Sequence, residues 1–110
     1  MQKDNAYLLD VLQSAKIAVS HLEGKEFKDY ESDIKTQDAV IRRLEMIGEA
    51  ANRVSDEAQK TYKDLPWQKM KSMRNFLIHE YDDIDLKIVW DTVHKNLPAL
   101  ISELEKIVSV

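Results

Sequence analysis

Apolar residues recur at steps of three and four along most of the chain, which is the spacing of helices that bury one face. The first such stretch covers about residues 4–22, with Leu8, Val11, Leu12, Ala15, Ala18, Val19 and Leu22 on one side. Asp4 or Asn5 can cap the start of this helix, and Gly24 can end it in the left-handed conformation. The pattern therefore predicts an amphipathic first helix.

A second long helix is predicted over about residues 36–54. Its apolar positions alternate steps of four and three, as in the seam of a helical bundle: Val40, Leu44, Ile47, Ala51 and Val54. Gly48, Ala50 and Ala51 are small, so another backbone can approach this helix closely there. Residues 25–35, which join the two helices, are charged and irregular, and the spacing of Phe27 and Tyr30 predicts a single short turn of helix.

Ser55 reads as a fresh N-cap, so we expect a break there and then a short helix to about residue 62. Pro66 suits the first position of a helix, which we expect to run to about residue 80. The apolar positions of that helix are Trp67, Met70, Met73, Phe76 and Leu77.

Asp85 can cap a last helix whose apolar period continues to the C-terminus. Its apolar positions are Leu86, Val89, Trp90, Val93, Leu97, Leu100, Ile101, Leu104 and Val108. Pro98 lies inside this run and removes the hydrogen bond to the carbonyl of His94, so a kink is expected. Together the pattern predicts an all-α, up-and-down bundle of four to five helices in one domain over residues 1–110.

Composition narrows the chemistry that such a bundle can perform. The chain has 110 residues, no cysteine and only two glycines. These counts exclude a disulfide scaffold, a thiol nucleophile, a cysteine zinc site and a glycine-rich phosphate loop. The net charge of -4 excludes a global electrostatic footprint for nucleic acid. No stretch has the length of a transmembrane helix, and no secretory leader is visible, so we expect a cytoplasmic protein.

The unusual residues lie between 73 and 81, where Arg74, Asn75, His79 and Tyr81 interrupt the apolar pattern. On a helical wheel Arg74 shares the inward row of Met70, and burying a guanidinium there requires a partner or an aqueous cleft. Arg74 and His79 would lie about 140° apart on one helix, so a single copy cannot easily aim both at one atom. A second copy of the helix, brought in by a dimer, could aim both residues at the same atom. Periodicity alone favours a structural role for both residues, as a snorkelling arginine and a helix-end histidine.

Arg74, four residues, His79, one residue and Tyr81 resemble the Arg-x4-His-x-Tyr motif of the HEPN superfamily, and in particular its HepT-like branch. The resemblance covers nearly the whole chain. It includes residues 35–42 and 47–51, the pair Pro66-Trp67, and residues 89–93. Asn75 also matches a polar residue that is usual in HEPN motifs.

This resemblance implies a HEPN-like fold and a metal-independent endoribonuclease toxin, without a cofactor, whose site forms between two subunits of a homodimer. Cleaving RNA without a metal requires a base, an acid and a cation for the phosphorane charge. His79 is the candidate for proton transfer, and Arg74 is the candidate for charge stabilisation. Asn75 would support them by positioning a phosphate or orienting His79.

The resemblance also implies a nucleotidyltransferase antitoxin as the partner, which silences the toxin by transferring AMP onto Tyr81. A bulky anionic group beside Arg74 and His79 would obstruct the cleft and compete for its cations. Without the resemblance, Tyr81 reads as an aromatic residue that covers the core. Two other functions stay open: a non-catalytic accessory subunit that holds nucleotide or substrate for a nucleotidyltransferase, and a degenerate scaffold that only dimerises.

Charge is unevenly distributed around the motif. Residues 60–74 hold five basic side chains and one acidic, Lys60, Lys63, Lys69, Lys71 and Arg74 against Asp64, a local charge of +4. Residues 80–85 hold Glu80, Asp82, Asp83 and Asp85, a local charge of -4. The basic run is either a set of solvated charges or an approach for RNA, with the acidic run then left for the partner protein.

Three further residues are weaker candidates. Asp91 and His94 stand one helical turn apart, but a metal site needs more ligands than these two, and no metal is expected. His21 closes the first helix, where an imidazole suits the helix dipole, so its role reads as structural.

Overall fold

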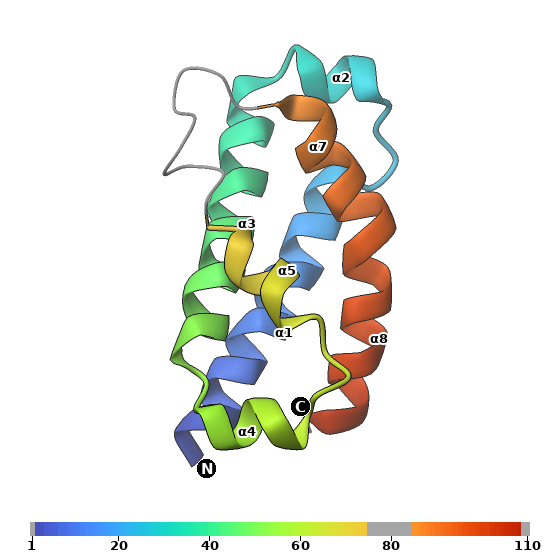
Figure 1. The fold of residues 1–110 in the computed structure, drawn as a ribbon. Coiled ribbons are helices and arrows are strands. Elements are labelled where there is room, and N and C mark those ends of the chain that lie inside the picture. Colours follow the sequence, from blue (N-terminus) through green and yellow to red (C-terminus); the bar gives the residue numbers. More distant parts are fainter. Residues whose placement is uncertain (1, 75–84, 109–110) are drawn as a thin grey trace.

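The computed structural model describes residues 2–74 and 85–108, and Figure 1 shows the arrangement of the helices. The elements are α1 (Gln2–Leu22), α2 (Phe27–Glu31), α3 (Ile34–Arg53), α4 (Asp56–Thr61), α5 (Trp67–Ser72), α7 (Leu86–Asp91), the π-helical turn η1 (Thr92–Asn96) and α8 (Leu97–Ile107). No strand occurs in these described ranges, so the predicted all-α class is confirmed.

Three helical columns run along the molecule: α1, α3 and the continuous path from α7 to α8 (Figure 1). α1 packs most extensively against α3 and then against α8. α2 and α4 lie at opposite ends of these columns, and α5 packs against α3 on the face between α3 and α8. None of the described helices is long and apolar enough to cross a membrane.

The core is built from the residues that the helical spacing predicts. Fully or almost fully buried positions include Leu8, Leu12, Leu44, Ile47, Met70, Val89, Leu97 and Leu104. Val19, Trp67, Leu86, Trp90 and Ile101 are partly buried and pack against this core. Phe76 and Leu77, which we also expected to face inward, lie outside the described residues.

Several predicted helix boundaries are confirmed by their caps. Gly24 has a φ of +74°, the left-handed conformation expected after α1. Ser55 caps α4 by accepting a hydrogen bond from the Ala58 N–H, and Asp85 caps α7 by accepting from the N–H groups of Lys87 and Ile88. α3 begins two residues earlier than predicted because Asp33 is its N-cap and accepts from both the N–H and the hydroxyl of Thr36.

Two sets of long-range hydrogen bonds among the described residues join the ends of helices. The carboxylate of Asp4, which is almost buried, accepts from the Ser55 N–H and hydroxyl at 2.8 Å each and so joins α1 to α4. At the opposite end of the bundle, the Tyr30 hydroxyl donates to the Leu86 carbonyl at 3.1 Å and joins α2 to α7. Burial, with a smaller contribution from Asp85, raises the pKa of Tyr30 to about 12, so this donor stays protonated.

The helix predicted over residues 66–80 is shorter in the structure. Pro66 precedes the helix instead of opening it, because its φ of -80° and ψ of 71° form an inverse γ-turn in which the Trp67 N–H donates to the Leu65 carbonyl at 2.9 Å. α5 then ends at Ser72, and Met73 and Arg74 form a turn. The remainder of the predicted helix, to Glu80, lies outside the described residues.

Pro98 distorts the last helix as predicted, but the distortion is a π-helical turn. The Leu97 N–H donates to the carbonyl of Thr92, five residues back, which widens the turn just before the proline. Since proline lacks an N–H and its ring crowds the carbonyl four residues back, a widened turn accommodates it without ending the helix. α7, η1 and α8 therefore form one continuous path (Figure 1).

Candidate functional site

Arg74 lies where the end of α5 meets α3 at Gly48. A Cβ built on Gly48 would stand 2.7 Å from the Arg74 nitrogen, 2.9 Å from the Arg74 Cβ and 3.1 Å from the Lys71 carbonyl oxygen. Such contacts are shorter than van der Waals packing allows, so only glycine permits this approach. The close approach expected from the small residues of this helix is therefore confirmed, and it fixes the backbone position of Arg74.

The expected inward orientation of Arg74 is wrong. Met70 is fully buried, but Arg74 is exposed because α5 ends at Ser72 and the inward row of that helix does not continue to residue 74. Arg74 is therefore an exposed residue whose backbone packs closely against Gly48. An exposed cation on a fixed backbone is available to an anionic group such as a phosphate.

The other residues of the motif, Asn75, His79 and Tyr81, lie outside the described residues. The same holds for Glu80, Asp82 and Asp83 of the acidic run. The fourth member of that run, Asp85, is described, and its carboxylate is engaged as the N-cap of α7.

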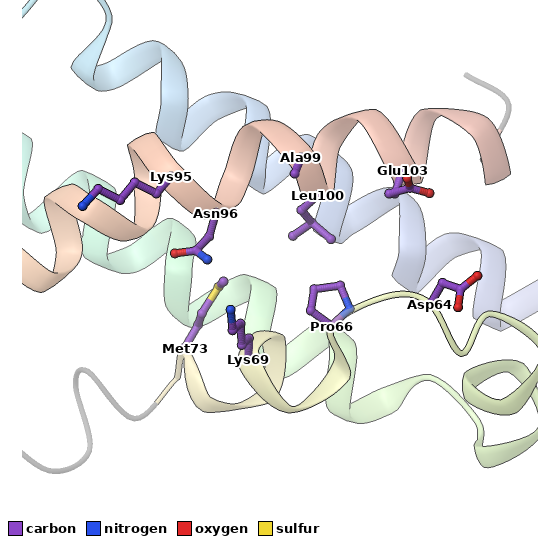
Figure 2. Close-up of a pocket in the computed structure, with 9 residues that line it drawn as sticks. All are labelled: Asp64, Pro66, Lys69, Met73, Lys95, Asn96, Ala99, Leu100 and Glu103. Carbon is purple, nitrogen blue, oxygen red and sulfur yellow. The ribbon is translucent and has the colours of Figure 1, made fainter.

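A groove separates α5 from the path of η1 and α8 (Figure 2). One cavity of about 270 Å³ lies between Pro66, Lys69 and Met73 on one side and Asn96 and Leu100 on the other. A second cavity of about 260 Å³ shares Lys69, Met73 and Asn96 and extends the groove towards Ile88. Its lining mixes apolar and polar side chains, and Met73, which lines both cavities, immediately precedes Arg74 in the chain.

A separate, open hollow lies between α4 and the start of α5. Its volume is about 330 Å³, and Asp56, Gln59, Lys60, Lys63 and Trp67 line it. The indole N–H of Trp67 donates to the Tyr62 carbonyl at 3.0 Å, which holds the ring in one orientation. We call this feature the Trp67 hollow.

The basic residues of this region form no ion pairs with the described carboxylates. Six basic side chains elsewhere are paired with carboxylates: Lys16, Lys25, Arg42, Lys87, Lys95 and Lys106. Within residues 2–74 and 85–108, no ion pair involves Arg53, Lys60, Lys63, Lys69, Lys71 or Arg74. The predicted basic run is therefore not neutralised by contacts to the described carboxylates.

One contact of this region could not be read from the sequence. The Lys71 ammonium donates to the Gln59 side-chain oxygen at 2.9 Å, which ties α5 to α4. Helical spacing shows which residues share a face of one helix, but it carries no signal for a pair across the γ-turn at Pro66. The contact places Lys71 beside a residue that lines the Trp67 hollow.

The weaker candidates have structural surroundings. Asp91 pairs with Lys87 at 3.4 Å and with Lys95 at 3.9 Å. The His94 ring stacks on Trp90 with centroids 4.1 Å apart, and its Nδ1 lies 2.8 Å from the Trp90 carbonyl oxygen. Over the described ranges, no group of three or more acidic or histidine side chains is placed to hold a metal ion. His21 stands in the last turn of α1, as expected.

Over the described residues, these features define a class of protein: a helical bundle with an exposed arginine at Gly48 and a run of basic side chains that form no ion pair with a described carboxylate. A family model described as "Ribonuclease HepT-like" matches residues 11–107, and the chain belongs to this HepT-like family of the HEPN superfamily. The family resemblance seen in the sequence is thereby confirmed.

Curated relatives agree with this assignment. The chain is 36% identical over 101 residues to a protein of Thermococcus cleftensis named probable ribonuclease HepT, covering 92% of each chain. It is 38% identical over 103 residues to a protein of Methanocaldococcus jannaschii named as a candidate RNase, covering 94% of this chain and 85% of that one. A candidate RNase of Caldanaerobacter subterraneus is 32% identical over 107 residues, with 97% and 96% covered. No solved structure matches the chain significantly.

Proposed function

We propose that this protein is a metal-independent endoribonuclease of a toxin–antitoxin pair, and that it cleaves RNA at a site shared by two subunits. The observation that carries the proposal is the close contact between the Arg74 backbone and Gly48, which restrains the backbone while the Arg74 residue stays exposed. Membership of the HepT-like ribonuclease family supports RNA as the substrate. One domain over residues 1–110 would supply each half of the site.

The proposed chemistry uses histidine for proton transfer and arginine for charge. A neutral His79 takes the proton of the ribose 2′-hydroxyl, and the 2′-oxygen attacks the adjacent phosphorus. The bond from phosphorus to the 5′-oxygen breaks, and a protonated imidazole gives its proton to that leaving oxygen. One of these two imidazoles belongs to the partner subunit's His79, so a separate histidine performs each proton transfer. Arg74 stabilises the negative charge that develops on the phosphorane oxygens.

A cleavage assay with a chelator present tests this assignment. We expect the native protein to cleave RNA, and Arg74→Ala and His79→Ala to lose about 100-fold or more of the rate, the range for removing a proton-transfer group or an oxyanion donor. The matched controls are Arg42→Ala, which removes an arginine that pairs with Glu45, and His21→Ala. Both controls should cleave like the native protein.

Other outcomes of the assay would decide against the proposal. Equal cleavage by all variants would identify a contaminating nuclease. Cleavage that disappears with the chelator would contradict metal independence. A native protein that binds nucleotide but cleaves no RNA would favour the non-catalytic accessory subunit. Sedimentation should give twice the chain mass of 12.8 kDa, and an active monomer would contradict the shared site.

The proposed regulation is transfer of AMP from ATP to Tyr81 by a nucleotidyltransferase partner. The phenolic oxygen bonds to the α-phosphorus and loses its proton, and the bond to the β-phosphate breaks to release pyrophosphate. An adenylyl group next to Arg74 and His79 would bring a phosphate charge into the cleft and compete for its cations. Incubation with the partner and ATP should raise the intact mass by one adenylyl group and abolish cleavage. A mass increase that persists in Tyr81→Phe would exclude Tyr81 as the sole acceptor.

A further inference from the structure

Trp67 presents an aromatic ring that the structure holds rigidly and leaves partly open. The inverse γ-turn at Pro66 fixes the backbone before it, and the hydrogen bond to Tyr62 fixes the indole. One part of the ring packs against the core, and another part lines the Trp67 hollow. A ring that is already fixed loses little conformational freedom when a planar ligand stacks on it.

Three lysines lie in or next to the hollow that Trp67 lines. Lys60 and Lys63 line the hollow directly and are exposed. Lys71 is held at its edge by the hydrogen bond to Gln59, another lining residue. None of the three makes an ion pair with a carboxylate in the described part of the chain. Asp56, also in the lining, adds one acceptor that suits an amino or hydroxyl group of a ligand.

α5 connects the hollow to Arg74, because Trp67 begins this helix and Arg74 follows its end at Ser72. Trp67 and Lys71 are four residues apart and share one face of that helix. The Lys71 carbonyl oxygen and the Arg74 nitrogen then meet the same point of α3, at Gly48. With a rise of 1.5 Å per residue, Trp67 and Lys71 are about 6 Å apart along the helix axis, and Arg74 lies in the turn that follows the end of α5 at Ser72. A single strand that binds at Trp67 and Lys71 can therefore continue to Arg74.

We propose that the Trp67 hollow is a base-stacking subsite for single-stranded RNA, with Lys60, Lys63 and Lys71 holding the phosphates that lead to Arg74. The inference rests on the proposed ribonuclease function, since it uses the same substrate. An aromatic face beside cations is the combination that binds single strands of any sequence. An acidic protein segment would use the lysines but has no need of the ring, so the hollow favours RNA.

Binding of a 2′-O-methyl RNA oligonucleotide tests the subsite separately from cleavage, because this RNA lacks the nucleophilic hydroxyl. We expect Lys60→Glu combined with Lys63→Glu to weaken binding by about 10-fold or more. The matched control is Lys28→Glu combined with Lys35→Glu, which makes the same change in net charge on exposed lysines of α2 and the start of α3, at the opposite end of the bundle. The control should bind within about 2-fold of the native protein.

The ring is tested with Trp67→Ala, expected to weaken binding about 10-fold, and with Trp67→Phe, expected to retain most of it. Because the chain has two tryptophans, a Trp90→Phe background isolates the fluorescence of Trp67, which should be quenched when RNA binds. If Trp67→Ala does not fold, the lysine variants and the quenching still decide the question.

Equal affinities of the two double-lysine variants, or unchanged Trp67 fluorescence on RNA binding, would overturn the subsite. So would a poly-glutamate peptide that competes as well as RNA of equal charge, since that result would assign the surface to an acidic protein. Failure of the proposed function looks different: the native protein would bind 2′-O-methyl RNA with quenching but leave ordinary RNA uncut.

Discussion

A side chain at Gly48 would meet the backbone of Arg74, so this single position couples the packing of α3 to the place of the guanidinium. The clash of Gly48→Ala with backbone atoms at 2.7 and 3.1 Å requires the end of α5 to move. We expect RNA cleavage to fall about 10-fold or more, since displacements near 1 Å are costly in active sites. The overpacking should cost about 1–3 kcal/mol, partly offset by the better helix propensity of alanine.

The other glycine provides a matched control for this prediction. Gly24→Ala strains the backbone, because φ is +74° there, but the added Cβ meets nothing within 4 Å. It should lower the melting temperature while leaving kcat/KM unchanged in the folded protein. If Gly24→Ala and Gly48→Ala reduce cleavage equally, the positioning of Arg74 by Gly48 is disproved.

Asp4 gives the stability a dependence on pH. Hydrogen bonds from the backbone and the hydroxyl of Ser55 hold the pKa of Asp4 below its usual value. A carboxyl whose pKa is lower when folded stabilises the fold above the unfolded pKa, about 3.9, and loses that contribution as the pH falls through its folded pKa. The native melting temperature should therefore exceed that of Asp4→Asn at pH 7, and the gap should shrink below about pH 4.

Asp10→Asn is the comparison for this titration, since Asp10 is exposed on the same helix. Thermal unfolding at pH 7 and at about pH 3 should show little difference between Asp10→Asn and the native protein. A gap for Asp4→Asn that stays constant with pH would show that the carboxylate charge is not what joins α1 to α4.

At the scale of elements, helix starts were predictable where one residue supplies the cap. Ser55 and Asp85 are short polar side chains that accept from N–H groups of the next turn, so their identity alone marks the boundary. The end of α5 and the π-turn before Pro98 were not predictable in this way. The end of α5 depends on packing against α3. The π-turn depends on which backbone hydrogen bonds the helix loses around the proline. Neither of these leaves a pattern in the local sequence.

The cap of α7 yields a stability prediction. Asp85 accepts from Lys87 N–H at 2.9 Å and from Ile88 N–H at 3.2 Å. Removing these acceptors with Asp85→Ala should cost about 1 kcal/mol of unfolding free energy, while Asp85→Asn should keep most of it. Denaturant unfolding measures both. Equal losses in the two variants would mean that the charge, and not the cap, stabilises this helix.

At the scale of the molecule, the motif was visible in the sequence but its setting was not. Helical spacing identified Arg74 as a polar residue in an apolar row. The small residues at and near Gly48 predicted that another backbone approaches closely there. The exposure of Arg74 was missed because it follows from where α5 ends. The Trp67 hollow was missed because residues of two short helices, on either side of a γ-turn, line it together. Hydrophobic periodicity describes the faces of one helix and not the packing of two helices across a turn. For His79 and Tyr81 the assignment still rests on the family motif.

The net charge of -4 does not prevent RNA binding, because screening acts over shorter distances than the size of the molecule. The Debye length is about 8 Å at physiological ionic strength, whereas the principal extents are 42, 29 and 19 Å. Lys60, Lys63, Lys71 and Arg74 should therefore set the salt dependence. With four phosphates neutralised, a plot of log affinity against log salt should have a slope of about -3.

Charge reversal at two of these positions gives the slope a second test. With Lys60→Glu and Lys63→Glu combined, two phosphate contacts remain, so the slope should fall in magnitude to about -1.4. The double variant at Lys28 and Lys35 should keep the native slope, because α2 and the start of α3, which carry them, lie at the opposite end of the bundle from α4 (Figure 1). The same slope in all three proteins would mean that the whole-molecule charge, and not this surface, governs the encounter with RNA.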